Sequence, residues 1–314
     1  MKKIIVILSF AVIIVGCRNV LKENIYNQLK QDKPLSNQFF YFNSDRDTIL
    51  KCKYGTDIYI KSNSFCDEFD SSISSNVKIT LEVLEFVRLT DMILNKISTL
   101  SNDKIIETGG MLNVIGRVDN KLLKLKEGEN IKVTFHSKLN TFSSFYCDNK
   151  KELFNWSTEQ LSIPPQAAVK KDTSLFLGDT TKWTKNNAKL NVLSFNKIGW
   201  INCDRFLNFD STTDIFVKAE GINLDSSTFC SVILKKYNSI IPGKLSLNTS
   251  MKFTPLPVDE IVTLFLISYK EGDYYMGIKD VVVKEKETYS VNLKLVSKEQ
   301  LKEKIEEFDK LRPL

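Results

Sequence analysis

The stretch VKITLEV at residues 77–83 decides the fold class of this protein. Its apolar residues fall at positions 77, 79, 81 and 83, and its polar residues fall at 78, 80 and 82. A period of two is typical of a β-strand with one face in an apolar core and the other in water. The stretch therefore predicts a strand of an antiparallel sheet that is wet on one side.

Similar short runs lie on both sides of this strand. Residues 57–61, 111–118 and 131–135 are of strand length, and the Gly, Asn and Asp residues between such runs favour hairpin turns. One short helix is predicted at 89–97, with Thr90 as its N-cap. We expect residues 38–138 to fold as a first β-sandwich.

A second β-rich region is predicted from residue 190 to residue 296. Its candidate strands are 189–195, 198–206, 214–219, 229–234, 261–268, 274–283 and 288–296. This number of strands in about a hundred residues suits an immunoglobulin-like sandwich. Residues 139–189, rich in Ser, Thr, Asn and Lys, are predicted to form a connector between the two sandwiches.

Over the C-terminal residues 297–314, the spacing of the apolar residues changes from the period of a strand to that of a helix. Leu301, Ile305, Phe308 and Leu311 form one apolar stripe at helical spacing, and Ser297 with Gln300 forms a possible capping box. We expect an amphipathic helix that docks on the second sandwich; the alternative is a helix that binds a partner or a membrane surface. The predicted fold class is all-β, with two sandwiches and this helix.

The N-terminal residues 1–16 have the features of a secretory signal peptide. Lys2 and Lys3 precede a largely apolar run at 4–15, which as a helix would cover roughly 18 Å and is too short for a hydrocarbon core of about 30 Å. The sequence Ile14-Val15-Gly16-Cys17 resembles the bacterial lipobox. The resemblance implies cleavage between Gly16 and Cys17 and attachment of lipid to Cys17; an ordinary signal peptide or a buried helix is the alternative.

Residues 17–37 are polar and contain Pro34, so we expect a lipid-anchored tether. Asn19, not Asp, stands two positions after Cys17. By resemblance to the sorting rules of Gram-negative lipoproteins, this favours the outer membrane, on either its periplasmic or its cell-surface face. The membrane, reached through the N-terminal lipid, is therefore one expected partner.

Composition narrows the possible functions. The chain has 44 Lys and Arg residues against 38 Asp and Glu, and its net charge of +6 falls to +4 when the signal peptide is removed. No basic run is present, so nucleic acid is not an expected partner. The single His and the lack of HExxH, GxSxG and phosphate-loop motifs favour a non-enzymatic protein without a cofactor or metal.

Several stretches together resemble a known module. They are GTDIYI at 55–60, VKITLE at 77–82, ETGGM at 107–111 and LKEG at 125–128. In order and spacing they resemble the ZU-type β-sandwich of ankyrins and netrin receptors, as it occurs in bacterial envelope lipoproteins. The string IGWINCDRF at 198–206 is similar to one in the same lipoproteins, although KSNSFC at 61–66 departs from their small-residue stretch. The resemblance implies a structural or binding component of the envelope, with an envelope protein or a glycan as partner; the alternative is a surface-exposed glycan- or protein-binding module for uptake or adhesion.

One candidate ligand site lies within that string. On a strand, Trp200, Asn202 and Asp204 share one face, and Arg205 points the other way. An aromatic ring beside amide and carboxylate groups can bind a sugar or a peptide. The alternative is that Trp200 belongs to the core and that Asp204 and Arg205 satisfy local polar groups.

The cysteines and the single histidine leave further alternatives. Cys52 with Cys66 and Cys203 with Cys230 could form disulfides, or these thiols could be free and buried. Some ZU-type modules cleave themselves, so the resemblance admits Ser137 as a nucleophile with His136 as its base. Self-cleavage is the third candidate function. Adjacent strand residues point to opposite faces of a sheet, so His136 is poorly placed to take a proton from Ser137.

Overall fold

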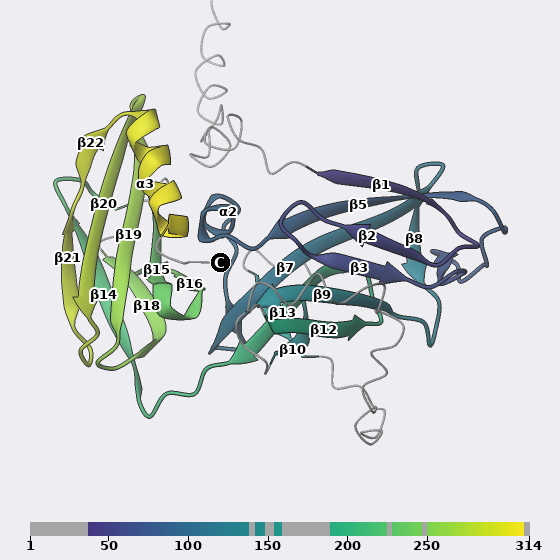
Figure 1. The fold of residues 1–314 in the computed structure, drawn as a ribbon. Helices are drawn as coiled ribbons and strands as arrows, with labels where there is room; N and C mark the ends of the chain where they lie inside the picture. Colours follow the sequence, from purple (N-terminus) through teal and green to yellow (C-terminus); the bar gives the residue numbers. More distant parts are fainter. Residues whose placement is uncertain are drawn as a thin grey trace, which may run out of the picture.

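The structure is a computed structural model that describes residues 37–137, 142–147, 154–158, 189–224, 228–246 and 250–310. It confirms the all-β fold class: two β-sandwiches lie side by side, and two helices lie where they meet (Figure 1). The predicted signal peptide, the tether and Cys17 lie outside the described residues. No helix in the described part of the chain is long and apolar enough to cross a membrane.

The first sandwich holds thirteen of the described strands and one helix. They are β1 (Gln38–Asn43), β2 (Thr48–Lys51), β3 (Asp57–Ile60), β4 (Phe65–Asp67), β5 (Lys78–Phe86), α2 (Leu89–Leu94), β6 (Leu100–Ser101), β7 (Lys104–Val118), β8 (Lys121–Leu125), β9 (Ile131–Ser137), β10 (Ser143–Cys147), β11 (Trp156–Ser157), β12 (Lys189–Phe195) and β13 (Gly199–Phe206). One sheet has the order β1-β5-β7-β13-β10-β11, and the facing sheet has the order β12-β9-β3-β2. The alternation predicted for residues 77–83 is confirmed, since Ile79, Leu81 and Val83 are at most 1% exposed.

The boundary predicted between the two sandwiches is wrong. Strand β12 pairs with β9, and β13 pairs with both β7 and β10, so residues 189–206 complete the first sandwich. Strands β10 and β11 lie within the predicted connector and also join this sheet. The cause is long-range pairing: β7, the central strand, needs a second neighbour, and a segment about ninety residues later supplies it.

The second sandwich contains the remaining strands. They are β14 (Thr212–Glu220), β15 (Thr228–Leu234), β16 (Ser239–Pro242), β17 (Lys244–Ser246), β18 (Ser250–Pro257), β19 (Ile261–Lys270), β20 (Asp273–Val282), β21 (Thr288–Asn292) and β22 (Lys294–Val296). A sheet of order β17-β18-β14-β21 faces a sheet of order β16-β15-β19-β20-β22. A short 3₁₀ turn at Lys235–Tyr237 connects β15 to β16.

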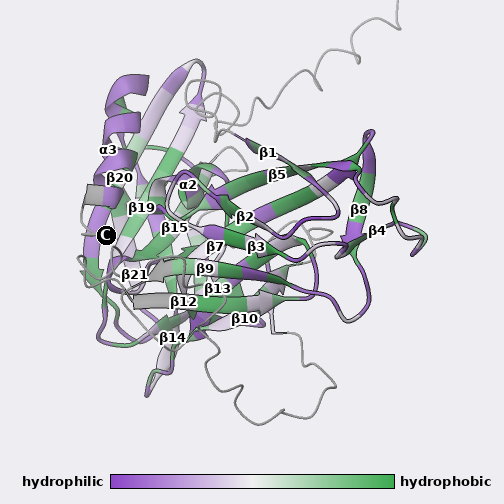
Figure 2. Cartoon of the chain, turned by 45° about the vertical axis from the view of Figure 1, so that its right-hand side comes forward, coloured by the Kyte–Doolittle hydropathy of each residue, from purple (hydrophilic) through white to green (hydrophobic). Residues whose placement is uncertain are grey.

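Helix α3 (Lys298–Lys310) follows the last strand. The predicted capping box is confirmed: the Ser297 amide donates to Gln300 Oε1 (2.8 Å), and the Gln300 amide donates to Ser297 Oγ (3.2 Å). Leu301, Ile305 and Phe308 are buried, as the apolar stripe predicts. The opposite face of α3 is mostly hydrophilic (Figure 2).

Helix α3 packs against the first sandwich as well as the second. Its Phe308 ring meets Phe265 of β19 edge to face, with the ring centroids 5.3 Å apart. Thr90 of α2 donates through Oγ to the Ile305 carbonyl (3.0 Å), and Asp309 accepts from the Thr90 amide (3.1 Å). The prediction of Thr90 as N-cap of α2 is therefore wrong, because Arg88 holds that position and Thr90 bonds to α3.

A single apolar cluster, here called the shared core, joins the two sandwiches. It contains Phe86, Leu89, Met92, Ile93, Ile97, Ile106, Met111, Phe145 and Trp156 from the first sandwich and Ile233, Ile240, Phe265, Ile267, Tyr274, Leu301, Ile305 and Phe308 from the rest of the chain. Hydrogen bonds cross the same junction: the Thr99 amide donates to the Ile240 carbonyl (3.0 Å), and Asn238 Nδ2 donates to the Thr108 carbonyl (3.0 Å). A continuous apolar interface of this kind holds two domains as one body.

Removing part of the α3 stripe tests the shared core. We expect Ile305→Ala to lower the free energy of unfolding by about 2–5 kcal/mol, because it deletes a side chain that is 1% exposed and leaves a cavity. Denaturant unfolding followed by circular dichroism measures this loss. The control Glu303→Ala, on the exposed face of the same helix, should change the free energy by less than about 0.5 kcal/mol; equal effects of the two variants would contradict the packing.

Candidate functional site

The residues predicted as a ligand site lie together on β13, where Asn202 and Asp204 are buried and Trp200 and Arg205 are partly exposed. Trp200, Asn202 and Asp204 share a face, and Asn202 and Asp204 are 0% exposed. The Trp200 ring packs against Phe86, with centroids 5.1 Å apart, and meets Phe154 edge to face at 4.7 Å. These contacts agree with the core alternative, since buried Asn202 and Asp204 offer no open surface to a sugar or a peptide.

Asn202 and Asp204 belong to a buried polar network. Thr108 Oγ donates to Asn202 Oδ1 (2.9 Å), and Asn202 Nδ2 donates to Asp204 Oδ2. The second carboxylate oxygen of Asp204 has no hydrogen-bond partner among the described residues. Burial raises the pKa of Asp204 well above its usual range, so the network holds a carboxyl group that favours its neutral form.

Arg205, on the opposite face of β13, makes an ion pair with Glu107 of β7. The two side chains are 2.6 Å apart, and the Glu107 side chain is 3% exposed. This ion pair agrees with the alternative interpretation, in which Arg205 satisfies a neighbouring polar group instead of binding a ligand.

The free-thiol alternative holds for the cysteines. Cys52, Cys66, Cys203 and Cys230 are buried and free, and Cys147 is partly exposed. The candidate disulfides Cys52–Cys66 and Cys203–Cys230 are therefore not formed. Burial raises the pKa of the Cys52, Cys203 and Cys230 thiols, so little reactive thiolate is present at neutral pH.

His136 and Ser137 end strand β9 and stand opposite Leu190 and Lys189 of β12. The structure describes their backbone but not their side chains. Self-cleavage at this position stays a prediction.

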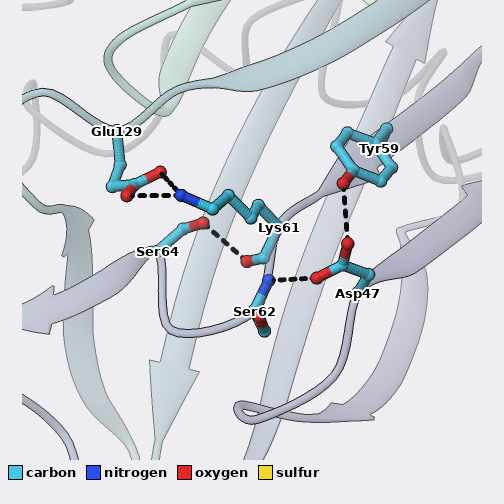
Figure 3. A network of polar contacts seen from close by, with 6 residues as sticks. All are labelled: Asp47, Tyr59, Lys61, Ser62, Ser64 and Glu129. Atoms are coloured by element: carbon cyan, nitrogen blue, oxygen red, sulfur yellow. Dashed lines mark hydrogen bonds and ion pairs between the residues drawn. The ribbon is translucent and has the colours of Figure 1, made fainter. Parts of the chain in front are cut away.

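The departure from the ZU-type pattern at residues 61–66 coincides with a local polar network (Figure 3). Asp47 accepts from the Tyr59 hydroxyl and from the Ser62 amide, each at 2.8 Å, and these bonds lower the pKa of Asp47. Lys61 makes an ion pair with Glu129 at 3.1 Å. The network fixes the turn after β3, which gives these polar residues a structural role.

A cleft of about 340 Å³ lies where the two sandwiches meet. The first sandwich contributes Ser98, Leu100, Asn102, Asp103, Phe154 and Asn155, and the second contributes Pro242, Lys244, Lys252 and Thr254. Its volume falls in the range of small-molecule sites, which are common at domain interfaces. None of these residues was predicted, because they come from four separate segments of the chain.

The wall from the first sandwich is built on a tight hairpin. Asn102 and Asp103 connect β6 to β7 with φ values of 46° and 61°, as a two-residue hairpin turn requires. The Asn102 amide donates to Asn155 Oδ1 (2.8 Å), and Asn155 Nδ2 donates to Asn102 Oδ1 (2.9 Å). These bonds hold Phe154 and Asn155 beside the turn, so this wall is formed in advance of any ligand.

Ser98 is a buried polar residue of this cleft. It is 1% exposed, and its Oγ has no hydrogen-bond partner among the described residues. Its carbonyl accepts from the Trp156 indole (2.7 Å), which fixes the backbone at this point. A buried hydroxyl without a partner costs free energy, and a hydrogen bond to a ligand would recover that cost.

The wall from the second sandwich carries two lysines. Lys244 of β17 and Lys252 of β18 stand directly opposite each other, an arrangement that is unfavourable for like charges. Asp214 of β14 relieves it by pairing with Lys252 at 2.6 Å, and this pairing lowers the pKa of Asp214. Lys244 has no ion-pair partner in the part of the chain that the structure describes.

A second, open groove of about 630 Å³ lies on the outer face of the first sandwich. Phe39 and Tyr41 of edge strand β1 line it and are 53% and 60% exposed. Thr80 and Glu82 of β5 and Arg117 of β7 lie beside them. Exposed aromatic rings next to polar side chains are a surface that a sugar or a protein can contact.

Among the described residues, no group of three or more His, Cys, Asp or Glu side chains is arranged to hold a metal ion. No family model and no curated protein matches the chain. Among solved structures, the chain is similar to the TIE protein of Bacillus anthracis, with 11% identity and a TM-score of 0.21. The match covers 83% of this chain and 41% of that one, so it spans less than half of the TIE protein, and at this TM-score it supports no inference.

The buried carboxyl group of Asp204 predicts a dependence of stability on pH. The folded protein binds a proton at Asp204 more tightly than the unfolded chain, so the free energy of unfolding falls as pH rises from about 4 toward the folded pKa. The contribution is at most about 1.4 kcal/mol per pH unit. We expect Asp204→Asn to remove this slope in denaturant titrations at pH 5, 6.5 and 8, and Asp210→Asn, an exposed control, to keep it.

The burial of the cysteines predicts a pattern of alkylation. Iodoacetamide at pH 8 should modify Cys147 in the native protein and leave Cys52, Cys203 and Cys230 unmodified, because these three are buried with raised pKa. In denaturant without a reducing agent all should react, as mass spectrometry of the peptides would show. A pair that reacts only after reduction would instead reveal a disulfide.

Proposed function

We propose that this protein is a lipid-anchored, non-enzymatic binding component of the bacterial outer membrane. The Ile14-Val15-Gly16-Cys17 lipobox and the polar tether at 17–37 support the anchor. The observation that carries the binding role is the cleft between the sandwiches, which is preformed and contains the buried, unpartnered hydroxyl of Ser98. The resemblance to ZU-type envelope lipoproteins supports the same assignment.

The outer groove favours a second candidate function, a surface-exposed glycan- or protein-binding module for uptake or adhesion. Phe39 and Tyr41 are more exposed than aromatic residues of a sheet usually are. Protease treatment of intact cells separates the two orientations: digestion indicates the cell surface, and protection indicates the periplasmic face.

Self-cleavage is the third candidate function, and two fragments of the mature protein on a denaturing gel would support it.

The anchor gives a direct prediction. Cys17→Ala should abolish incorporation of labelled palmitate and shift the protein from the membrane fraction to the soluble fraction, because the thiol that carries the acyl chains is removed. Cys147→Ala serves as a control and should keep both the label and the membrane fraction. Labelling or membrane retention that survives Cys17→Ala would contradict the lipid anchor.

A further inference from the structure

The cleft between the two sandwiches presents opposite charges from its two walls. Asp103 belongs to the β6–β7 turn of the first sandwich, and Lys244 belongs to β17 of the second. Neither residue has an ion-pair partner among the described residues, and the two do not pair with each other. The separation of these charges across a cleft, instead of their mutual neutralisation, is a pattern that a ligand with two charged ends would complement.

The remaining charge of the cleft is already balanced. Lys252 is paired with Asp214 at 2.6 Å, so it adds little net charge. Asp103 and Lys244 then leave the lining close to neutral, which disfavours a ligand with a large net charge of either sign.

The middle of the cleft offers apolar surface and one polar anchor. Leu100, Phe154 and Pro242 supply the apolar surface, and the Phe154 ring is fixed by stacking on Trp156, with centroids 6.0 Å apart. Ser98 Oγ supplies the hydrogen-bonding group, whereas the Thr254 side chain already hydrogen-bonds to Asp214. A ligand with an apolar side chain and a peptide group between its charged ends would fill these positions.

We propose that this cleft binds a zwitterionic dipeptide with an apolar side chain. Lys244 binds the terminal carboxylate, Asp103 binds the terminal ammonium group, and Ser98 Oγ hydrogen-bonds to the peptide group between them. This inference rests on the proposed binding role and names the ligand class of the same site.

The test uses the full chain in detergent micelles and isothermal titration calorimetry. The probes are leucyl-alanine, its N-acetyl form, its C-terminal amide and glucuronate. We expect leucyl-alanine to bind about twofold to fivefold more tightly than either blocked form, since each block removes one charge pair. Equal binding of all three peptides, or no binding of leucyl-alanine at millimolar concentration, would overturn the proposal.

Charge-removing variants test which charged end of the dipeptide Asp103 and Lys244 each bind. Asp103→Asn should remove the preference for leucyl-alanine over the N-acetyl form, and Lys244→Gln should remove the preference over the amide. The matched controls Asp273→Asn and Lys294→Gln, exposed residues of the second sandwich outside the cleft, should keep both preferences. Preferences that survive Asp103→Asn and Lys244→Gln would place the ligand elsewhere and overturn the proposal.

Two serine variants test the role of the Ser98 hydroxyl without a change of charge. Ser98→Ala should weaken leucyl-alanine binding about threefold to tenfold. Ser231→Ala is the control, since Ser231 Oγ is also buried without a partner among the described residues but does not line the cleft. If glucuronate alone binds, and Ser98→Ala weakens it, the proposed binding role stands and the dipeptide assignment falls. Labelling or membrane retention that survives Cys17→Ala would overturn the lipid anchor alone and leave the binding role untouched.

Discussion

The shared core between the two sandwiches is the interaction on which the rest of the structure depends. Apolar side chains from α2, β7 and β11 belong to the same buried cluster as side chains from β16, β19 and α3. Neither sandwich buries this surface alone, so exposure of it would cost each of them several kcal/mol. The cleft exists because the shared core fixes one sandwich against the other.

Helix α3 shows how this constraint works. Its apolar stripe packs against both sandwiches, and its Asp309 and the Ile305 carbonyl satisfy polar groups of Thr90 at the start of α2. Helix α2 is too short to be stable alone, so its ends depend on partners from elsewhere in the chain. A C-terminal segment thereby helps to position α2 at the end of the first sandwich that faces the second.

Polar residues at the junction divide into two kinds. Thr108, Asn202 and Asp204 are buried and bonded to one another, which restricts how β7 and β13 pair. Ser98, Asp103 and Lys244 line a cleft and lack such partners among the described residues. The first kind stabilises a unique arrangement, and the second kind leaves hydrogen-bonding and charged groups for a ligand.

The local features of this protein follow from its amino-acid sequence alone. The alternation at 77–83, the capping box of Ser297 and Gln300, and the apolar stripe of α3 were all predictable, because each depends on residues a few positions apart. Three outcomes depend on the tertiary structure: residues 189–206 join the first sandwich, Trp200 packs against the shared core, and Ser98, Asp103 and Lys244 line one cleft. These outcomes depend on contacts between segments tens of residues apart, and a strand pattern specifies which face is buried but not which strand will be its neighbour.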